Sequence, residues 1–164
     1  MHKVFLGIGG NLGKKPENFK KVHRFIHNDL GEIVNSSSVY ETPPWGFEAN
    51  ESFWNQVLEI DTNYSPSQLL GKIHEIEHRF GRKRNTKKYS SRQMDIDILY
   101  YDDIFMETEN LVIPHPLMQK RKFVLVPLAE IAPQLQHPLL RLTTLQMLEN
   151  CRDQSVIKKI DSRY

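Results

Sequence analysis

Hydrophobic and polar residues alternate over residues 92–99, and this alternation predicts a strand with two chemically different faces. Met94, Ile96 and Ile98 occupy every second position, and β-branched isoleucine favours a pleated, half-buried surface. Successive side chains of a strand point to opposite sides, so Asp95 and Asp97 are expected to share the face away from the core. At a rise of about 3.3 Å per residue, their stems would lie roughly 6.6 Å apart.

The same kind of pattern predicts the rest of the fold. The expected elements are, in chain order, a strand over 3–8, a helix over 16–30, strands over 33–40 and 53–61, a helix over 66–80 and the strand over 92–99. Capping-box spacing at Ser65 and Gln68, with Pro66 at the first helical position, marks the start of the second helix. The order fits an α+β fold with a ferredoxin-like βαββαβ core. Apolar residues 123–131 and an amphipathic stretch over 143–149 predict carboxy-terminal helical additions.

Two of the predicted connections carry features that binding loops often have. Residues 43–52 open with Pro43-Pro44 and continue with Trp45-Gly46, which predicts a long loop of the kind that often binds ligands. Residues 9–13 are rich in glycine but lack the G-x-G-x-x-G and Walker patterns, so we expect a flexible loop there.

Residues 82–92 contain six cations and no acid, directly before the aspartate pair. Carboxylates hold Mg²⁺ and arginine forks bind phosphate oxygens, so this succession suits a magnesium-bound polyphosphate. A solvated loop followed by a solvated strand face, or a nucleic-acid patch, would show the same charges.

Alternation over 53–61 places Phe53 and Asn55 on one face. An aromatic ring beside a carboxamide suits a flat heterocycle, because the ring stacks while the amide donates and accepts hydrogen bonds. A packed aromatic side chain beside a solvated asparagine is the alternative interpretation.

The stretch from His74 to His78 matches the zinc-protease pattern H-E-x-x-H. Both histidines fall opposite the apolar stripe of the predicted helix, and Glu77 and Arg79 are expected to add charge around them. A zinc cleft needs a partly enclosed site and a third ligand, so we interpret the match as a coincidence.

Composition narrows the class of protein further. The chain has 164 residues, of which 39% are hydrophobic and 26% charged, so we expect one globular catalytic domain over 1–164. A net charge of +2 is too small for a dedicated nucleic-acid binder. The single cysteine, Cys151, fits a reducing compartment, and the apolar start is too short for a signal peptide or membrane span. We therefore expect a cytoplasmic protein.

With these motifs in view, residues 1–150 resemble the 6-hydroxymethyl-7,8-dihydropterin pyrophosphokinase family, which consists of ATP-dependent diphosphotransferases of folate biosynthesis. The motifs that carry the resemblance are Arg92-x-x-Asp95-Ile96-Asp97-Ile98-Leu99, Thr42-Pro43-Pro44, Phe53-x-Asn55, and Pro114-His115-Pro116 followed by Arg121 and Phe123. This sequence departs from the family pattern at a few positions. At positions 10, 89 and 90 it has Gly10, Tyr89 and Ser90, where other residues are more frequent in the family.

The resemblance implies transfer of the β,γ-diphosphate of ATP to the pterin alcohol, with AMP as the other product. Asp95 and Asp97 would hold two Mg²⁺ ions, and together with Arg82 and Arg92 they form the implied catalytic set. The residues assigned to ATP are Arg82, Arg84, Arg92, Ile98, His115 and Arg121. Those assigned to the pterin are Thr42, Pro43, Trp45, Phe53, Asn55, Asp95 and Phe123, with the two phenylalanines on either side of the ring.

The implied partners are small molecules, without nucleic acid or membrane, and the expected state is a monomer. The alternative is a single-stranded RNA module, because ferredoxin-like sheets with exposed aromatic residues can stack bases. The RNA-binding pattern of Arg/Lys-Gly-Phe is missing from the sequence, and an acidic pair on the sheet would repel phosphate.

Overall fold

The protein is built around an antiparallel β-sheet, and the computed structural model describes residues 1–42, 51–81 and 93–160. The strands of this sheet are β1 (His2–Gly10), β2 (Glu32–Ser36), β3 (Tyr40–Thr42), β4 (Phe53–Thr62), β5 (Asp95–Tyr101) and β8 (Lys158–Lys159). Their spatial order is β5-β1-β4-β3-β8, and β2 pairs with another part of β4. β5 therefore ends the sheet on one side.

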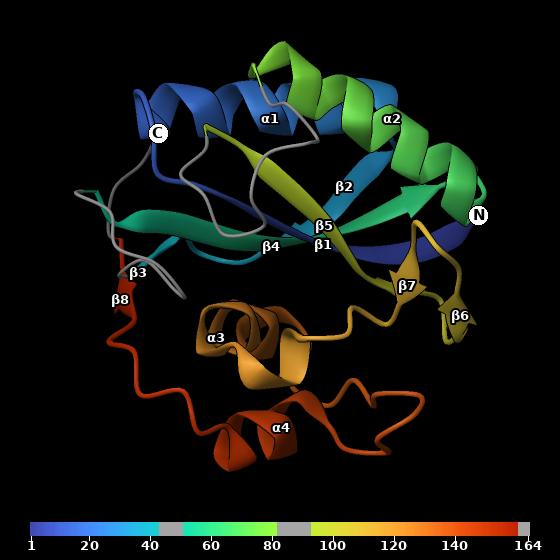
Figure 1. Ribbon diagram of the computed structural model, residues 1–164, viewed down its shortest axis with the longest axis vertical. Helices are drawn as coiled ribbons and strands as arrows, with labels where there is room; N and C mark the ends of the chain where they lie inside the picture. Colours follow the sequence, from blue (N-terminus) through green and yellow to red (C-terminus); the bar gives the residue numbers. More distant parts are fainter. Residues whose placement is uncertain (43–50, 82–92, 161–164) are drawn as a thin grey trace.

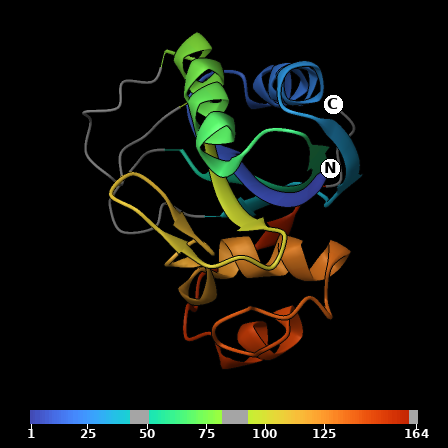
Figure 2. The same cartoon turned by 90° about the vertical axis from the view of Figure 1, so that its right-hand side faces the viewer.

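Helices cover the two faces of the sheet as separate layers (Figure 1). They are α1 (Lys15–Asp29), α2 (Pro66–Arg79), α3 (Lys122–Ile131) and α4 (Thr144–Asn150). α1 and α2 cover one face, and α3 and α4 lie on the other, as the view turned by 90° also shows (Figure 2). The small sheet of β6 (Met106–Glu107) and β7 (Val112–Ile113) and the short helix η1 (Met118–Lys120) lie between β5 and α3 in the chain.

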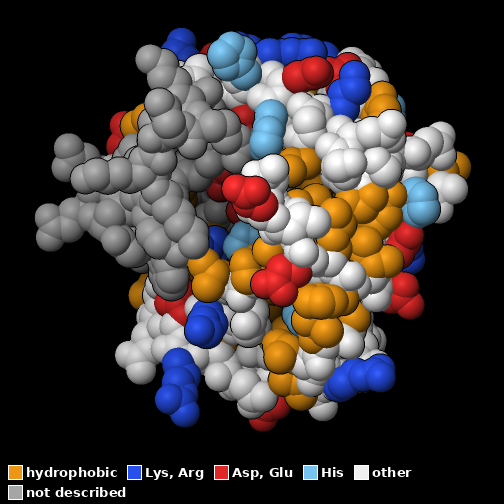
Figure 3. Space-filling model, turned by 45° about the vertical axis from the view of Figure 1, so that its right-hand side comes forward, with side chains coloured by type: hydrophobic (Ala, Val, Ile, Leu, Met, Phe, Trp, Pro, Cys, Tyr) orange, Lys and Arg blue, Asp and Glu red, His pale blue; other side chains and the backbone are white. Residues whose placement is uncertain are grey.

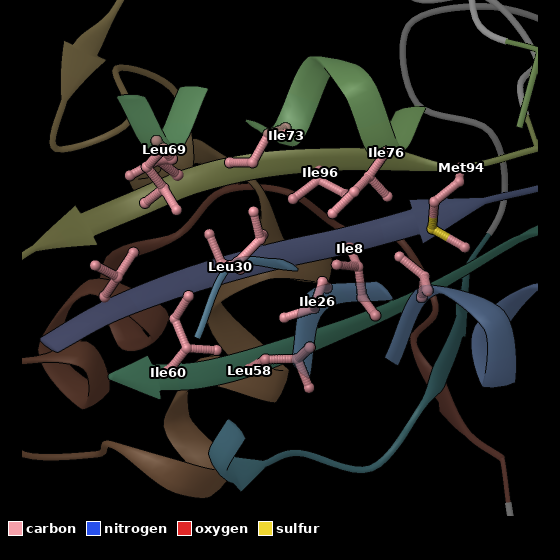
Figure 4. Close-up of a cluster of buried hydrophobic side chains, with 14 of the residues drawn as sticks. Ile8, Ile26, Leu30, Leu58, Ile60, Leu69, Ile73, Ile76, Met94 and Ile96 are labelled. Atoms are coloured by element: carbon pink, nitrogen blue, oxygen red, sulfur yellow. The ribbon is translucent and has the colours of Figure 1, made fainter. Parts of the chain in front are cut away.

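The alternating side chains of β4 and β5 divide the interior into two hydrophobic clusters. Met94, Ile96 and Ile98 belong to the cluster under α1 and α2, which also contains Ile73 and Ile76 of α2. Figure 4 shows these α2 side chains directed toward β5. Burying one such aliphatic side chain contributes about 1.5–3 kcal/mol, so this cluster is a main source of stability. The opposite face of the sheet packs against α3 and α4 in the second cluster.

The predicted mixed fold with an antiparallel sheet is confirmed, and so is the second helix with its capping box at Ser65 and Gln68. Several elements differ in extent or number, and one of them is β5, which spans Asp95–Tyr101 where we expected a strand over 92–99. The predicted strand over 33–40 is two strands, β2 and β3, which pair with different parts of β4. β1 continues through Gly9 and Gly10, where we expected a flexible loop. The tail adds β8, which pairs with β3 and was not predicted.

A carboxylate near the end of α3 connects this helix to the sheet. Glu130 accepts hydrogen bonds from the Tyr40 hydroxyl at 2.6 Å and from the Ser38 hydroxyl at 2.9 Å, and the Ser38 backbone N–H also donates to it. Burial on its own raises the pKa of Glu130, but these hydrogen bonds and the charge of Lys159 outweigh it and hold the pKa below its usual value. The folded state therefore favours the ionised carboxylate.

This bond set predicts a pH-dependent contribution to stability. Because the pKa of Glu130 is lower in the folded than in the unfolded state, its contribution is present above the unfolded pKa, about 4.3, and is lost as the pH falls through the folded pKa. We expect the difference in free energy of unfolding between the wild type and Glu130→Gln to shrink between pH 7 and pH 3. Urea denaturation at several pH values measures it, with exposed Glu109→Gln as the control. A pH-independent difference would contradict the prediction.

Candidate active site

Asp95 and Asp97 lie on the same face of β5, as the sequence alternation predicts. Both carboxylate residues are half-buried, whereas Ile96 between them is buried in the cluster under α1 and α2. The pair faces the side of the sheet on which α3 lies, because Leu99, two residues further along, packs in the α3 cluster. The core thus occupies one side of this strand and two carboxylates the other.

Two glycines of β1 keep the sheet free of side chains beside these carboxylates. Gly9 lies opposite Asp95 on one side and opposite Asn55 of β4 on the other, and Gly7 lies opposite Asp97. Neighbouring strands are about 4.8 Å apart, so the stems of Asp95 and Asn55 are separated by about 10 Å with only backbone between them. β1 thus contributes only backbone between these two strands, and the Asn55 carboxamide oxygen occupies the space over Gly9.

The Asn55 carboxamide depends on the missing side chain at Gly9. A Cβ at Gly9 would overlap Asn55 Oδ1 and lie 3.1 Å from the Trp54 carbonyl oxygen. Asn55 Nδ2 donates to the Thr42 hydroxyl oxygen at 3.3 Å, and Thr42 is buried at the end of β3. The Asn55 carboxamide is therefore held in one orientation, with its oxygen beside Gly9.

Phe53 stands opposite Thr42 at the start of β4, on the same face as Asn55. It is half-buried. The sequence-predicted combination of an aromatic ring and a carboxamide on one face is thus present, across Gly9 from the aspartates.

His115 is tied to the aspartate strand by its backbone. Its N–H donates to the Leu99 carbonyl of β5 at 3.0 Å. The Leu117 N–H donates to Nδ1 of the ring at 3.2 Å, so in the neutral imidazole the proton is on Nε2. Nε2 lies 3.9 Å from Asp97 Oδ2, so the side of the ring that carries the proton is next to the carboxylate.

Figure 3 shows acidic, basic and histidine side chains gathered in a recess of the surface.

Arg121 and Phe123 lie at the start of α3, over the same face of the sheet. The Arg121 side chain is buried, and its guanidinium carbon lies 5.6 Å from the centre of the Phe123 ring. The Asp153 carboxylate accepts from the Lys122 N–H at 3.1 Å and from the Ser155 N–H and hydroxyl. Burial raises the pKa of Asp153, but the Ser155 and Lys122 contacts outweigh it and lower the pKa. Asp153 thus anchors this end of α3 from the tail, a role with no local sequence signal.

Some of the predicted site residues lie outside the part of the chain that the structure describes, and the side chain of Ile98 is buried. Pro43, Trp45, Arg82, Arg84 and Arg92 lie outside the described residues. The Ile98 side chain is buried in the cluster under α1 and α2, so a contact with ATP would use its backbone.

The surroundings of the H-E-x-x-H stretch differ from our expectation at one residue. His74 is half-buried and His78 is exposed on α2. We expected Glu77 to add charge around them, which is wrong, because Glu77 is 1% exposed and its carboxylate accepts from the Ile96 N–H. Within the described ranges, no group of three or more His, Cys, Asp or Glu side chains could hold a metal ion.

Comparison with known proteins places the chain in a family. The model of the family 7,8-dihydro-6-hydroxymethylpterin-pyrophosphokinase (HPPK) matches residues 5–133. The 2-amino-4-hydroxy-6-hydroxymethyldihydropteridine pyrophosphokinase of Aquifex aeolicus is 41% identical over 141 residues, which are 86% of this chain and 87% of that protein. Its namesake from Bacillus subtilis is 37% identical over 134 residues, 81% of this chain and 80% of that protein.

Other similar proteins are longer. The folic acid synthesis protein FOL1 of Dictyostelium discoideum is 39% identical over 147 residues, which cover 90% of this chain but 22% of that protein. The crystal structure of wild-type Plasmodium falciparum HPPK-DHPS has a TM-score of 0.73 at 18% identity, covering 92% of this chain and 43% of that one. The latter match shows a shared fold.

These matches define the class of protein as a pyrophosphokinase, a transferase of folate synthesis. The chain belongs to the HPPK family. No helix in the part of the chain that the structure describes is long and apolar enough to cross a membrane.

The close approach at Gly9 gives a prediction for the site. Gly9→Ala is expected to turn the Asn55 carboxamide away and break its hydrogen bond to Thr42, at a cost of about 1 kcal/mol in stability. The side-chain amide signals of Asn55 in an NMR spectrum report this change. Gly7→Ala is the matched control, because its Cβ would meet Leu99 at an ordinary 3.5 Å. Unchanged Asn55 signals in Gly9→Ala would show that the carboxamide is not held in this way.

Proposed function

We propose that this chain transfers the β,γ-diphosphate of ATP to the hydroxymethyl oxygen of 6-hydroxymethyl-7,8-dihydropterin and releases AMP. Membership of the HPPK family supports pyrophosphokinase activity with ATP as co-substrate. The structural observation that supports the finer assignment is the pair Asp95 and Asp97, half-buried on one face of β5. Asn55 lies across Gly9 from this pair, so one ligand could contact both the carboxamide and the carboxylates.

The aspartate pair fits two Mg²⁺ ions. Mg²⁺ in such sites is bound through one or two carboxylates, with waters and substrate phosphates as further ligands, so two half-buried carboxylates suffice. Asp95 and Asp97 would hold the ions, and the imidazole of His115 beside Asp97 would limit where the latter carboxylate points. When bound, the ions neutralise phosphate charge and lower the pKa of the pterin hydroxyl.

The residues around Asn55 suit a pterin. Phe53 on the sheet and Phe123 on α3 supply two aromatic rings in the two layers that face each other. Asn55, fixed by Thr42, would hydrogen-bond the edge of the heterocycle, which offers neighbouring donors and acceptors. The resemblance adds Pro43 and Trp45 to this set, from outside the described residues.

On the phosphate side, the chain supplies cations. Arg121 at the start of α3 is the described cation of this set, His115 beside Asp97 offers its Nε2–H as a donor, and Arg82, Arg84 and Arg92 complete the proposed set. Their role is to hold the triphosphate in line with the pterin hydroxyl, since phosphoryl transfer depends mainly on alignment and charge neutralisation.

In the reaction itself, the hydroxymethyl oxygen forms a bond to the β-phosphorus of ATP. The bond from that phosphorus to the α,β-bridging oxygen breaks, and AMP keeps this oxygen. The hydroxyl proton passes to solvent, so no protein group is needed as a dedicated base. Held by Phe53 and Asn55 on one side and by His115 and Arg121 on the other, the two substrates would meet above Asp95 and Asp97.

We further propose a ferredoxin-like βαββαβ core, a single catalytic domain over 1–164, and a monomer in the cytoplasm that binds neither nucleic acid nor membrane. The strand order β5-β1-β4-β3 supports the core assignment.

The first test concerns the products. With ATP, Mg²⁺ and the pterin alcohol, we expect AMP and pterin diphosphate in equal amounts, because the β–γ unit moves intact. Anion-exchange chromatography with phosphorus NMR measures both products. Release of ADP instead would identify a different phosphoryl transfer, and no reaction would refute the assignment.

The second test concerns the carboxylate pair. Asp97→Ala should lower AMP release at least about 10³-fold, since a metal clamp contributes several kcal/mol to the transition state. Pterin binding, followed by ligand fluorescence, should remain measurable because Phe53 and Asn55 lie on β4. Asp103→Ala, an exposed acid after the same strand, is the control and should keep full activity. Retained turnover in Asp97→Ala would contradict the proposed role.

A further inference from the structure

Glu77 is a buried carboxylate that the reaction described above does not use. It lies in the last turn of α2, where His78 and Arg79 are exposed, yet it is itself 1% exposed. Its Oε2 accepts a hydrogen bond from the Ile96 N–H at 2.9 Å. Ile96 is the residue between Asp95 and Asp97, so Glu77 contacts the backbone of the aspartate pair from the side of α2.

This hydrogen bond occupies a position that sheet pairing leaves open. Within residues 1–42, 51–81 and 93–160, β5 ends the sheet, so its N–H groups that point away from β1 have no neighbouring strand there to donate to. Backbone groups alternate in direction along a strand, so the Ile96 N–H points outward to Glu77 while Asp95 and Asp97 pair inward with Gly9 and Gly7. The three-residue segment is thereby held from both sides.

A carboxyl group buried at this position is unfavourable unless its oxygens accept hydrogen bonds, as Glu77 does from the Ile96 N–H. Ile73 and Ile76 of the same helix, Met94 just before β5 and Ile96 of β5 belong to the apolar cluster under α1 and α2 (Figure 4). Moving a charged group out of water into such surroundings is unfavourable, whereas an apolar side chain there would extend the cluster. A buried hydrogen bond to a charged acceptor is also stronger and more directional than one in water.

We propose that Glu77 is a positioning residue for the diphosphate transfer. By fixing the backbone at Ile96, it sets the spacing and direction of the Asp95 and Asp97 carboxylates for the metal ions. Its carboxylate reaches the strand from the α2 layer, whereas the aspartates face the α3 layer. This inference rests on the proposed function of the aspartate pair.

Two substitutions separate the hydrogen bond from the charge. Glu77→Gln keeps an oxygen acceptor for the Ile96 N–H, whereas Glu77→Met removes the acceptor and keeps the side-chain length. We expect Glu77→Gln to stay within about threefold of the wild-type kcat, and Glu77→Met to lose at least about tenfold and to need more Mg²⁺ for half-maximal rate. The KM for the pterin should change less than kcat in either variant, because Thr42, Phe53, Asn55 and Phe123 of the proposed pterin set lie on β3, β4 and α3.

Amide exchange supplies a readout that does not depend on turnover. In the absence of ligands, the Ile96 N–H should exchange at least about tenfold faster in Glu77→Met than in the wild type, because it loses its acceptor. The amides of β4 should keep their protection. If Glu77→Met does not fold, Glu77→Asp replaces it, since the shorter side chain withdraws the carboxylate while keeping its charge.

Ile76→Val is the matched control. It weakens the packing of α2 on the same cluster but leaves the hydrogen bond intact, so it should lower stability without changing kcat or the Mg²⁺ dependence. A Glu77→Met enzyme with normal kcat and Mg²⁺ dependence would overturn the inference, and so would a Glu77→Gln enzyme as impaired as Glu77→Met. An inactive wild type would instead refute the proposed function.

Discussion

Because β5 ends the sheet, its outward-facing backbone groups have to be paired by something other than a strand. Two of these backbone groups are hydrogen-bonded by residues of the candidate site or by residues that pack against it. The Ile96 N–H donates to Glu77 of α2, and the Leu99 carbonyl accepts from the His115 N–H. The same requirement therefore fixes the strand that carries Asp95 and Asp97 and brings the histidine ring beside the second carboxylate.

On the side of the candidate site away from the edge of β5, two features matter: the missing side chain at Gly9 and the contacts that hold α3 in place. Glycine at position 9 gives Asn55 its place over β1, and Thr42 fixes the carboxamide. α3 brings Phe123 over this face and is attached at both ends, through Asp153 at its start and Glu130 near its finish. A rigid sheet face and a tethered helix together suit a flat ligand that must be oriented for attack.

Patterns within single elements were predictable from the sequence. Alternation gave the correct faces for β5 and β4, and the capping box gave the start of α2. What failed depends on contacts between distant parts of the chain. A helical pattern counts Glu77 as a surface charge, because only the edge position of β5 creates a buried acceptor site for it. Likewise, β8 and Asp153 have no local signature, since their partners lie at Tyr40 and Lys122.

The way in which the edge of β5 is covered also affects the behaviour of the protein at high concentration. Unpaired strand edges act as templates for strands of other molecules and lead to aggregation. Here a side chain from α2 and a backbone amide from the segment after β7 occupy two of those template positions. The bonds next to Asp95 and Asp97 therefore also protect the protein against intermolecular β-pairing at this edge.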